Sequence, residues 1–325
     1  MHLRGRQRDL RRRGRRSRRR HRFDPSRGGG RIFTVTAVRP VERARWPSFW
    51  KVEGLGNDFV LVDLRSRPDA ANVATRLAAA TPELCDRHRG VGADGVLLVL
   101  DAPDGVRMRV VNHDGSVPEM CGNGLRCVAL YVALADCLRL PADVYVATDA
   151  GPRPCTVLTA DGMRGTVRAD MGTARTEGSV TPQAAEGRTA IAVDVGNPHA
   201  VFVCDPGTDL AELARRLGPA IERDPAFPSG TNVEFATLDA QGEDGAVVTC
   251  VVWERGCGLT QACGTGACAT AAALAARTAI TRFEVRLPGG PLAVSVGPAH
   301  RVAAEGPARL VFHGRHPTAD PNTAP

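Results

Sequence analysis

The chain has 325 residues, 43% of them hydrophobic, which is long enough for about two domains and ample for an enzyme. Its ten cysteines are too sparse for a disulfide-rich secreted scaffold, and neither a signal-peptide pattern nor a long apolar span is visible. We therefore expect a reduced, cytoplasmic protein without a membrane segment.

The net charge of +7 comes from one end of the chain. Residues 1–31 contain fourteen arginines against two aspartates, so this segment carries about +12 and the remainder is mildly acidic. With few apolar residues to bury, residues 1–48 are predicted to form a disordered tail, as are the polar residues 316–325. The arginines allow nonspecific contact with nucleic acid, but aromatic side chains are almost absent and no nucleic-acid function is expected.

From Lys51 onward, four signals recur in the same order after an offset of about 140 residues, a period that suits two similar domains. They are a turn before a strand, a glycine-containing loop before a strand, a strand that ends in polar side chains, and Cys-Gly-x-Gly before an apolar helix. Their positions are 56–59 with 196–199, 90–95 with 229–232, 110–115 with 251–256, and 121–124 with 263–266.

The helices predicted over 125–134 and 267–280 are apolar around their whole circumference, which is typical of buried helices. Short alternating runs between the motifs indicate half-exposed strands. We therefore predict an α/β fold with two pseudo-symmetric domains, each a mixed, barrel-like sheet around a central buried helix. The domains are expected over 49–169 and 170–308, and a final strand over 309–315 is expected to return to the N-terminal domain.

The two Cys-Gly-x-Gly motifs place Cys121 and Cys263 at predicted helix N-termini. Free backbone N–H groups and the helix dipole stabilise a thiolate there, so a lowered thiol pKa is expected. Glycines allow a carboxylate to approach the same N–H groups. We interpret Cys127 and Cys268 as packed thiols in the same helices, and leave the role of Cys257 open. The remaining cysteines are interpreted as core residues, namely Cys85, Cys137, Cys155, Cys204 and Cys250.

Several other chemistries are disfavoured by the residue pattern. No Cys-x-x-Cys pair exists and the histidines do not accompany the cysteines at ligand spacing, so neither a metal site nor a thioredoxin-like site is expected. Lys51 is the only lysine and begins a strand, which argues against pyridoxal phosphate or another cofactor. A base and an acid on opposite faces of one carbon invert its configuration, so the paired thiols point to a racemase or epimerase. A tight turn that caps a buried helix is the alternative explanation of each motif.

From Lys51 to about Gly314 the chain resembles the diaminopimelate epimerases, a group of cofactor-independent two-cysteine enzymes. The resemblance lies in the motifs at 56–59, 87–95, 112–116, 119–127, 196–199, 230–232, 254–256 and 261–266. It implies epimerisation of LL- to meso-2,6-diaminopimelate for lysine and peptidoglycan synthesis. It also implies Cys263 as proton acceptor and Cys121 as proton donor in that direction, with His199 and Glu254 tuning the thiols.

The resemblance further implies a set of residues that bind the substrate, with Arg255 as the natural partner of its distal carboxylate. They are Asn57, Asn112, Gly122, Asn123, Asn197, Asn232, Glu254, Arg255, Gly264 and Thr265. Each residue also has a simpler explanation. Asparagine is common in such turns because it tolerates their backbone conformation, and His199 could serve only to bind a buried carbonyl group. Cys257 and Leu259 depart from the family, which commonly has a small residue and a glutamate there. We also expect a homodimer.

Two rival functions remain open at this point. A proline or hydroxyproline racemase has a similar two-thiol design, but typically carries histidine where Asn123 stands. A non-catalytic ligand or nucleic-acid binding protein on the same scaffold would be expected to lack one motif cysteine, and this chain has both.

Overall fold

The computed structural model describes residues 47–315, and these belong to one compact unit. Apart from Pro47 and Ser48, the expected tails at 1–48 and 316–325 lie outside the described residues. None of the described helices is long and apolar enough to cross a membrane.

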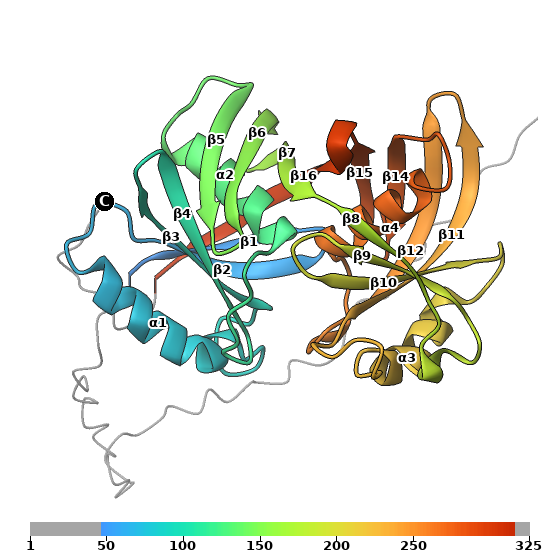
Figure 1. The fold of residues 1–325 in the computed structure, drawn as a ribbon. Helices are drawn as coiled ribbons and strands as arrows, with labels where there is room; N and C mark the ends of the chain where they lie inside the picture. The colour runs from blue at the N-terminus through green and yellow to red at the C-terminus, as the bar shows by residue number, and fades with distance from the viewer. Residues whose placement is uncertain (1–46, 316–325) are drawn as a thin grey trace, which may run out of the picture. The chain divides into compact units, whose positions relative to one another are not determined.

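The described chain contains two similar sets of elements joined by a shared last strand (Figure 1). The first set is β1 (Phe49–Gly54), β2 (Asn57–Asp63), α1 (Ala70–Cys85), β3 (Gly95–Ala102), β4 (Gly105–Asn112), α2 (Gly122–Ala135), β5 (Ala142–Thr148), β6 (Gly151–Asp161) and β7 (Arg164–Thr173). The second is β8 (Arg175–Val180), η1 (Gln183–Ala185), β9 (Ala190–Asp194), β10 (Pro198–Cys204), α3 (Leu210–Ile221), β11 (Asn232–Gly242), β12 (Gly245–Glu254), β13 (Gly258–Leu259), α4 (Gly264–Ala275), β14 (Arg282–Leu287), β15 (Gly290–Val296) and η2 (Pro298–His300). The shared strand is β16 (Arg301–Gly314).

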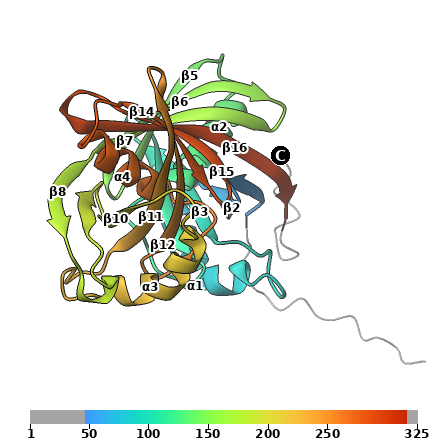
Figure 2. The same ribbon diagram turned by 90° about the vertical axis from the view of Figure 1, so that its right-hand side faces the viewer.

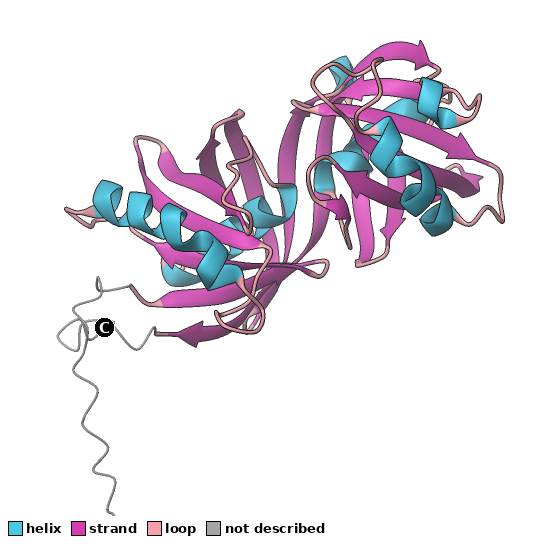
Figure 3. Ribbon diagram, turned by 90° about the horizontal axis from the view of Figure 1, so that it is seen from below, coloured by secondary structure: helices cyan, strands magenta, loops and turns pink. Residues whose placement is uncertain are grey.

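The N-terminal half is a closed eight-stranded barrel around α2. Its strands follow the order β1-β2-β3-β4-β5-β6-β7-β16, and β16 pairs with β1 to complete the ring. The C-terminal half has the order β16-β15-β14-β12-β11-β10-β9-β8 and wraps around α4. Both sheets mix parallel and antiparallel pairs, and Figure 3 shows them as two strand layers, each with an enclosed helix. The predicted fold class is confirmed.

The main hydrophobic core joins the two halves, because α2 and α4 both bury their whole circumference in it. The amphipathic helices α1 and α3 instead cover the outer faces of the sheets (Figure 2). Leu77 of α1 packs on Val60 and Leu98, and Leu217 of α3 packs in a separate cluster with the stacked rings of Phe202 and Phe235.

Some boundaries and burial states differ from the sequence predictions. The helix expected to reach Ile280 ends at Ala275, and the last strand begins at Arg301 rather than at 309 because it also pairs with β7 and β15. Cys137 was predicted to be buried, but it is exposed at a positive φ of 53° in the turn after α2. Cys204 is only partly buried because it lies at the end of β10.

The strand registers give the residue correspondence between the halves. Phe59 pairs with Gly95 and His199 pairs with Asn232, so the buried pair Leu61–Leu97 corresponds to Val201–Glu234. Asn112 and Glu254 end equivalent strands, each nine residues before the cysteine of its half. The motif alignment predicted from sequence, which matched Asn112 with Trp253, is therefore wrong by one residue.

The tip of the β14–β15 hairpin contacts the turn between β1 and β2. Gly289 donates its N–H to Gln261 O at 2.7 Å, and a Cβ at Gly289 would lie 1.9 Å from Leu55 O. We expect Gly289→Ala to lower the free energy of unfolding by about 2 kcal/mol, because the hairpin must shift away from the turn. Urea denaturation measures this change. Gly242→Ala, with no atom within 4 Å of its built Cβ, is the control, and equal stability of the two variants would contradict the contact.

Candidate active site

A cavity of about 380 Å³ lies between the N-termini of α2 and α4. It is lined by every residue that the sequence predicts for the site except His199, which is buried behind its wall. The two helices approach so closely that a Cβ on Gly264 would lie 3.3 Å from the Cα of Gly122. The absence of side chains at these two glycines thus allows both helix starts to meet at one place.

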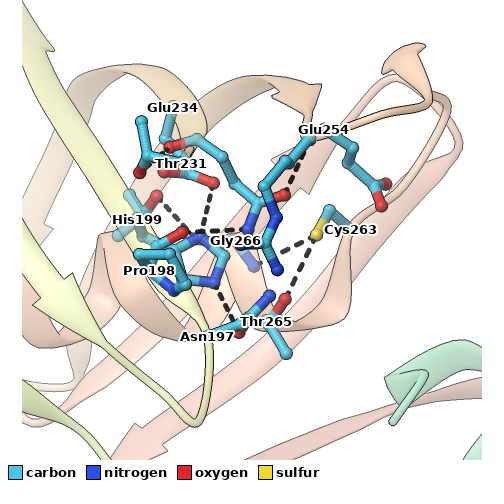
Figure 4. Close-up of polar contacts among 12 residues, drawn as sticks. Asn197, Pro198, His199, Thr231, Glu234, Glu254, Cys263, Thr265 and Gly266 are labelled. Carbon is cyan, nitrogen blue, oxygen red and sulfur yellow. Dashed lines mark hydrogen bonds and ion pairs between the residues drawn. The ribbon is translucent and has the colours of Figure 1, made fainter. Parts of the chain in front are cut away.

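Each motif cysteine is the N-cap residue of its helix, and each thiol accepts a hydrogen bond from the backbone two residues into the helix. The Cys121 sulfur accepts from Gly124 N at 3.4 Å, and the Cys263 sulfur accepts from Gly266 N at 3.3 Å. The Cys263 sulfur has a second polar contact, with Thr265 Oγ1 at 3.3 Å (Figure 4). The sulfurs occupy the position of a usual N-cap oxygen, at the positive end of the helix dipole.

Burial outweighs the effect of the helix N-terminus on the pKa of both thiols. It raises the pKa of the Cys121 thiol to about 11, against the opposing hydrogen bond from Gly124. Burial raises the pKa of Cys263 well above its ordinary value, and the carboxyl groups of Glu254 and Glu234 raise it further. The lowered thiol pKa predicted from sequence is therefore wrong, since the desolvation of a thiolate at these positions costs more than the cap contributes.

Asn57 is held on the Cys121 side of the cavity by charged neighbours. Its Nδ2 donates to Asp94 Oδ2 at 2.8 Å, which turns Oδ1 toward the Cys121 sulfur at 3.8 Å and toward Asn123 Nδ2 at 3.2 Å. Asp94 is itself paired with Arg87 at 2.7 Å. Asn123 also donates to Ala262 O at 2.9 Å, so this amide links the two halves directly beside both thiols.

Asn197, the counterpart of Asn57, is held by a buried histidine. Its Oδ1 lies 3.0 Å from His199 Nε2, and His199 Nδ1 lies 2.7 Å from Glu234 Oε1, as Figure 4 shows. The side chains of His199 and Glu234 have no exposed surface. Glu234 also lies under the start of α4, where its Oε1 would be 2.8 Å from a Cβ on Gly266. His199 thus reaches the cavity through Asn197 and not by direct contact.

Glu254 is the last residue of β12 and Arg255 follows it, at the opposite wall of the cavity. Glu254 Oε1 accepts from Thr260 Oγ1 at 2.5 Å. Burial raises the pKa of the Glu254 carboxyl, against hydrogen bonds from Thr260 and Cys263. Arg255 N donates to Asn232 Oδ1 at 3.0 Å, and its guanidinium donates to Ser229 O at 2.8 Å, which leaves further donors for an anion in the cavity.

The remaining wall contains both expected and unexpected groups. Asn112 donates to Ser116 Oγ at 3.0 Å. Cys257 and Leu259, which replace a small residue and a glutamate of the family pattern, also line the cavity. Burial raises the pKa of Cys257 to about 11, and Leu259 is 41% exposed. Among residues 47–315, no group of His, Cys, Asp and Glu side chains has the arrangement of a metal site.

Two acidic residues of the site were not predicted from the sequence: Asp94, which holds Asn57, and Glu234, which contacts Asn197 through His199. Asp94 lies in the motif at 87–95, but nothing in the sequence indicates that it contacts Asn57. Glu234 interrupts a short apolar stretch of β11, between Val233 and Phe235, and this interruption by an acid was the available signal. The arrangement as a whole offers two thiols, amide donors from both halves and a guanidinium, that of Arg255, with donors beyond the one that binds Ser229 O. It suits a small zwitterion whose carboxylate binds the paired helix starts.

Comparisons with known proteins agree with this geometry. The family model described as diaminopimelate epimerase matches residues 49–177 and 191–311. The diaminopimelate epimerase of Desulforudis audaxviator is 44% identical over 292 residues, which cover 82% of this chain and 98% of the relative. Diaminopimelate epimerase 1 of Nostoc sp. is 39% identical, with the same coverage of both chains. A solved probable proline racemase from Agrobacterium radiobacter has the same fold, with a TM-score of 0.62 at 18% identity, covering 85% of this chain and 94% of its own.

Proposed function

The chain belongs to the diaminopimelate epimerase family, which confirms the resemblance seen in the sequence, and from this premise we propose that it interconverts LL- and meso-2,6-diaminopimelate. The enzyme is an amino-acid epimerase. The proposal includes a two-base mechanism without a cofactor and a role in lysine and peptidoglycan precursor synthesis in the cytoplasm. The predicted homodimer remains a prediction.

In the proposed mechanism, Cys263 takes the α-proton from the LL isomer and Cys121 supplies a proton to the opposite face of the carbon. The thiol of Cys263 must first lose its own proton. The nearby Glu254 carboxylate is suited to accept that proton, because burial raises the pKa of Glu254 and so makes its carboxylate a stronger base. In the reverse direction the two cysteines exchange roles.

The α-carboxylate is proposed to bind the backbone N–H groups at the starts of α2 and α4, formed by Gly122, Asn123, Gly264 and Thr265. Donors there stabilise the negative charge that develops when the α-proton leaves. The distal amino-acid group is proposed to bind Asn57, Asn112, Asn197, Asn232 and the Glu254–Arg255 pair. His199 then tunes Cys263 through the buried Glu234 and positions Asn197.

The single observation that carries the proposal is the meeting of two thiol-capped helix starts at one cavity. The test is incubation of purified, reduced protein with LL-diaminopimelate without added cofactor, with the isomers separated by chiral chromatography. We expect conversion toward a mixture of the LL and meso forms. A folded, reduced sample that leaves LL-diaminopimelate unchanged would refute the proposal.

The same assay separates the alternatives. Racemisation of proline or hydroxyproline in place of diaminopimelate would support the enzymatic rival, which Asn123 disfavours. Binding without turnover would support a non-catalytic protein. Salt-sensitive binding of nucleic acid that disappears on deletion of residues 1–48 would give the arginine-rich segment a role of its own.

A further inference from the structure

Arg126 is a charged residue buried in the core one turn into α2. None of its surface is exposed, and its hydrogen-bond partners are oxygens of uncharged groups. Nη2 donates to Asn123 Oδ1 at 2.8 Å, Nε donates to Pro307 O at 3.3 Å, and Nη1 donates to Gly122 O at 3.4 Å. No ion pair joins it to a carboxylate among residues 47–315.

The surroundings of Arg126 have the space that a guanidinium requires. A Cβ on Gly54 of β1 would lie 3.6 Å from Nη2, and a Cβ on Gly306 of β16 would lie 3.5 Å from Nε. Burial lowers the pKa of Arg126, and the largest opposing influences come from cysteines, with Cys127 and Cys121 first. Arginine nevertheless stays protonated in proteins, so a positive charge is fixed in the core without an internal counter-ion.

The other half of the molecule shows that the fold does not require this charge. Cys268 occupies the equivalent position in α4, since each residue follows its motif cysteine by five positions. Cys268 is equally buried and uncharged, yet α4 has the same cysteine cap and the same apolar surroundings. An unpaired buried cation is costly, and replacing a buried charge with an apolar residue is often neutral or stabilising. The charge at Arg126 therefore calls for a role beyond packing.

We propose that Arg126 is a positioning residue that supplies fixed positive charge to the paired helix starts, where it favours the thiolate of Cys121 and an anionic ligand. It acts through two oxygens, because it holds the Asn123 amide, whose Nδ2 contacts Asn57 and Ala262, and the carbonyl of Gly122. The identity of the ligand as an amino-acid carboxylate rests on the proposed function, whereas the effect of Arg126 on the Cys121 thiolate is independent of that function.

Several other titratable groups line the same cavity as the Cys121 thiol, and their influence on its pKa is the same in the wild type and in the variants. Glu254, Arg255, Cys257 and Cys263 lie in the cavity wall contributed by the C-terminal half, and Arg87, Asp94 and His113 belong to the wall from its own half. None of these is altered in the variants below.

The experiment measures alkylation of Cys121 by iodoacetamide in the substrate-free protein between pH 7 and 11, with each site resolved by fragment mass spectrometry. In Arg126→Met, the alkylation rate at Cys121 is expected to fall about tenfold or more throughout this range, because a rise of one unit in the pKa of the thiol lowers its thiolate fraction tenfold at each pH below the pKa. The melting temperature is expected to stay level or rise, and kcat/KM for diaminopimelate to fall at least tenfold. Exposed Cys137 in the same protein is the internal control, and its profile is expected to stay unchanged.

An unchanged Cys121 profile in a folded Arg126→Met protein would overturn the proposal, as would a lowered melting temperature with no change at the thiol. If Arg126→Met does not fold, Arg126→Gln and Arg126→Lys decide, because the proposal requires the neutral variant to shift the profile more than the charged one. Since no substrate is present during alkylation, this result stands apart from the outcome of the epimerase assay.

Discussion

Cys121→Ala and Cys263→Ala are each expected to reduce epimerisation by about 10⁴-fold or more while the protein stays folded. One variant lacks the group that takes the α-proton from the LL isomer, and the other lacks the group that protonates the opposite face. Lys51, the only lysine, cannot replace either thiol as a base, because it is buried in an ion pair with Asp58 at 2.5 Å. Isomer composition by chiral chromatography measures the effect in both directions.

The chain provides matched controls for these two variants. Cys127 and Cys268 are fully buried thiols within the same helices but do not line the cavity. Cys127→Ala and Cys268→Ala are expected to keep activity within a few-fold of the wild type, with lower stability from the cavities they leave. Either active-site variant has a small cost in stability as well, about 1 kcal/mol, from the lost cap. Full inversion by Cys121→Ala or Cys263→Ala would contradict the assignment of two bases.

Arg255→Met is expected to lower kcat/KM for diaminopimelate by about 100-fold, mostly through KM. The reason is that a charge-assisted bond to a distal carboxylate contributes about 3 kcal/mol to ground state and transition state alike. Steady-state kinetics at fixed pH separates KM from kcat.

Two comparisons sharpen this prediction. Arg215→Met alters an exposed guanidinium paired with Glu212 far from the cavity, and we expect unchanged kinetics. Lysine, which lacks the distal carboxylate, is expected to inhibit the wild type and Arg255→Met equally weakly. Much weaker inhibition of the variant than of the wild type by lysine would show that Arg255 binds something other than the distal carboxylate.

Local patterns in the sequence were sufficient to predict the fold class and the two motif cysteines, whereas the other predicted residues of the cavity wall came from the resemblance to the diaminopimelate epimerases. Two copies of Cys-Gly-x-Gly before apolar helices predicted both the duplication and the enclosed helices α2 and α4. The correspondence of Asn112 with Glu254 was missed, because only the ladder between strands fixes register to a single residue. The outer helices α1 and α3 were not predicted either, because they lie between the repeated motifs from which the fold was inferred.

The electrostatics of the site could not be predicted from sequence. A helix start alone favours a thiolate, but the depth of burial at Cys121 and Cys263 reverses the balance, and depth depends on how both halves pack together. The contacts of Glu234 with His199 and of Asp94 with Asn57 join residues 35 and 37 positions apart, so no local spacing indicates them. Two partners of Arg126, Gly122 and Asn123, lie within one turn of the same helix, but the third, Pro307 on the shared strand β16, is 181 positions away in sequence.

The central claim is that two different thiols handle the protons on the two faces of the α-carbon. The most direct measurement is the early time course of LL-diaminopimelate in deuterated water, with deuterium at the α-carbon followed separately in the meso product and in the remaining LL substrate. Two bases predict that the meso product carries deuterium from the start, while the remaining LL substrate keeps its proton, because Cys263 returns the proton it removed. Early deuterium in the remaining LL substrate at the rate of its appearance in the product would indicate one base that exchanges with water, and would contradict the account.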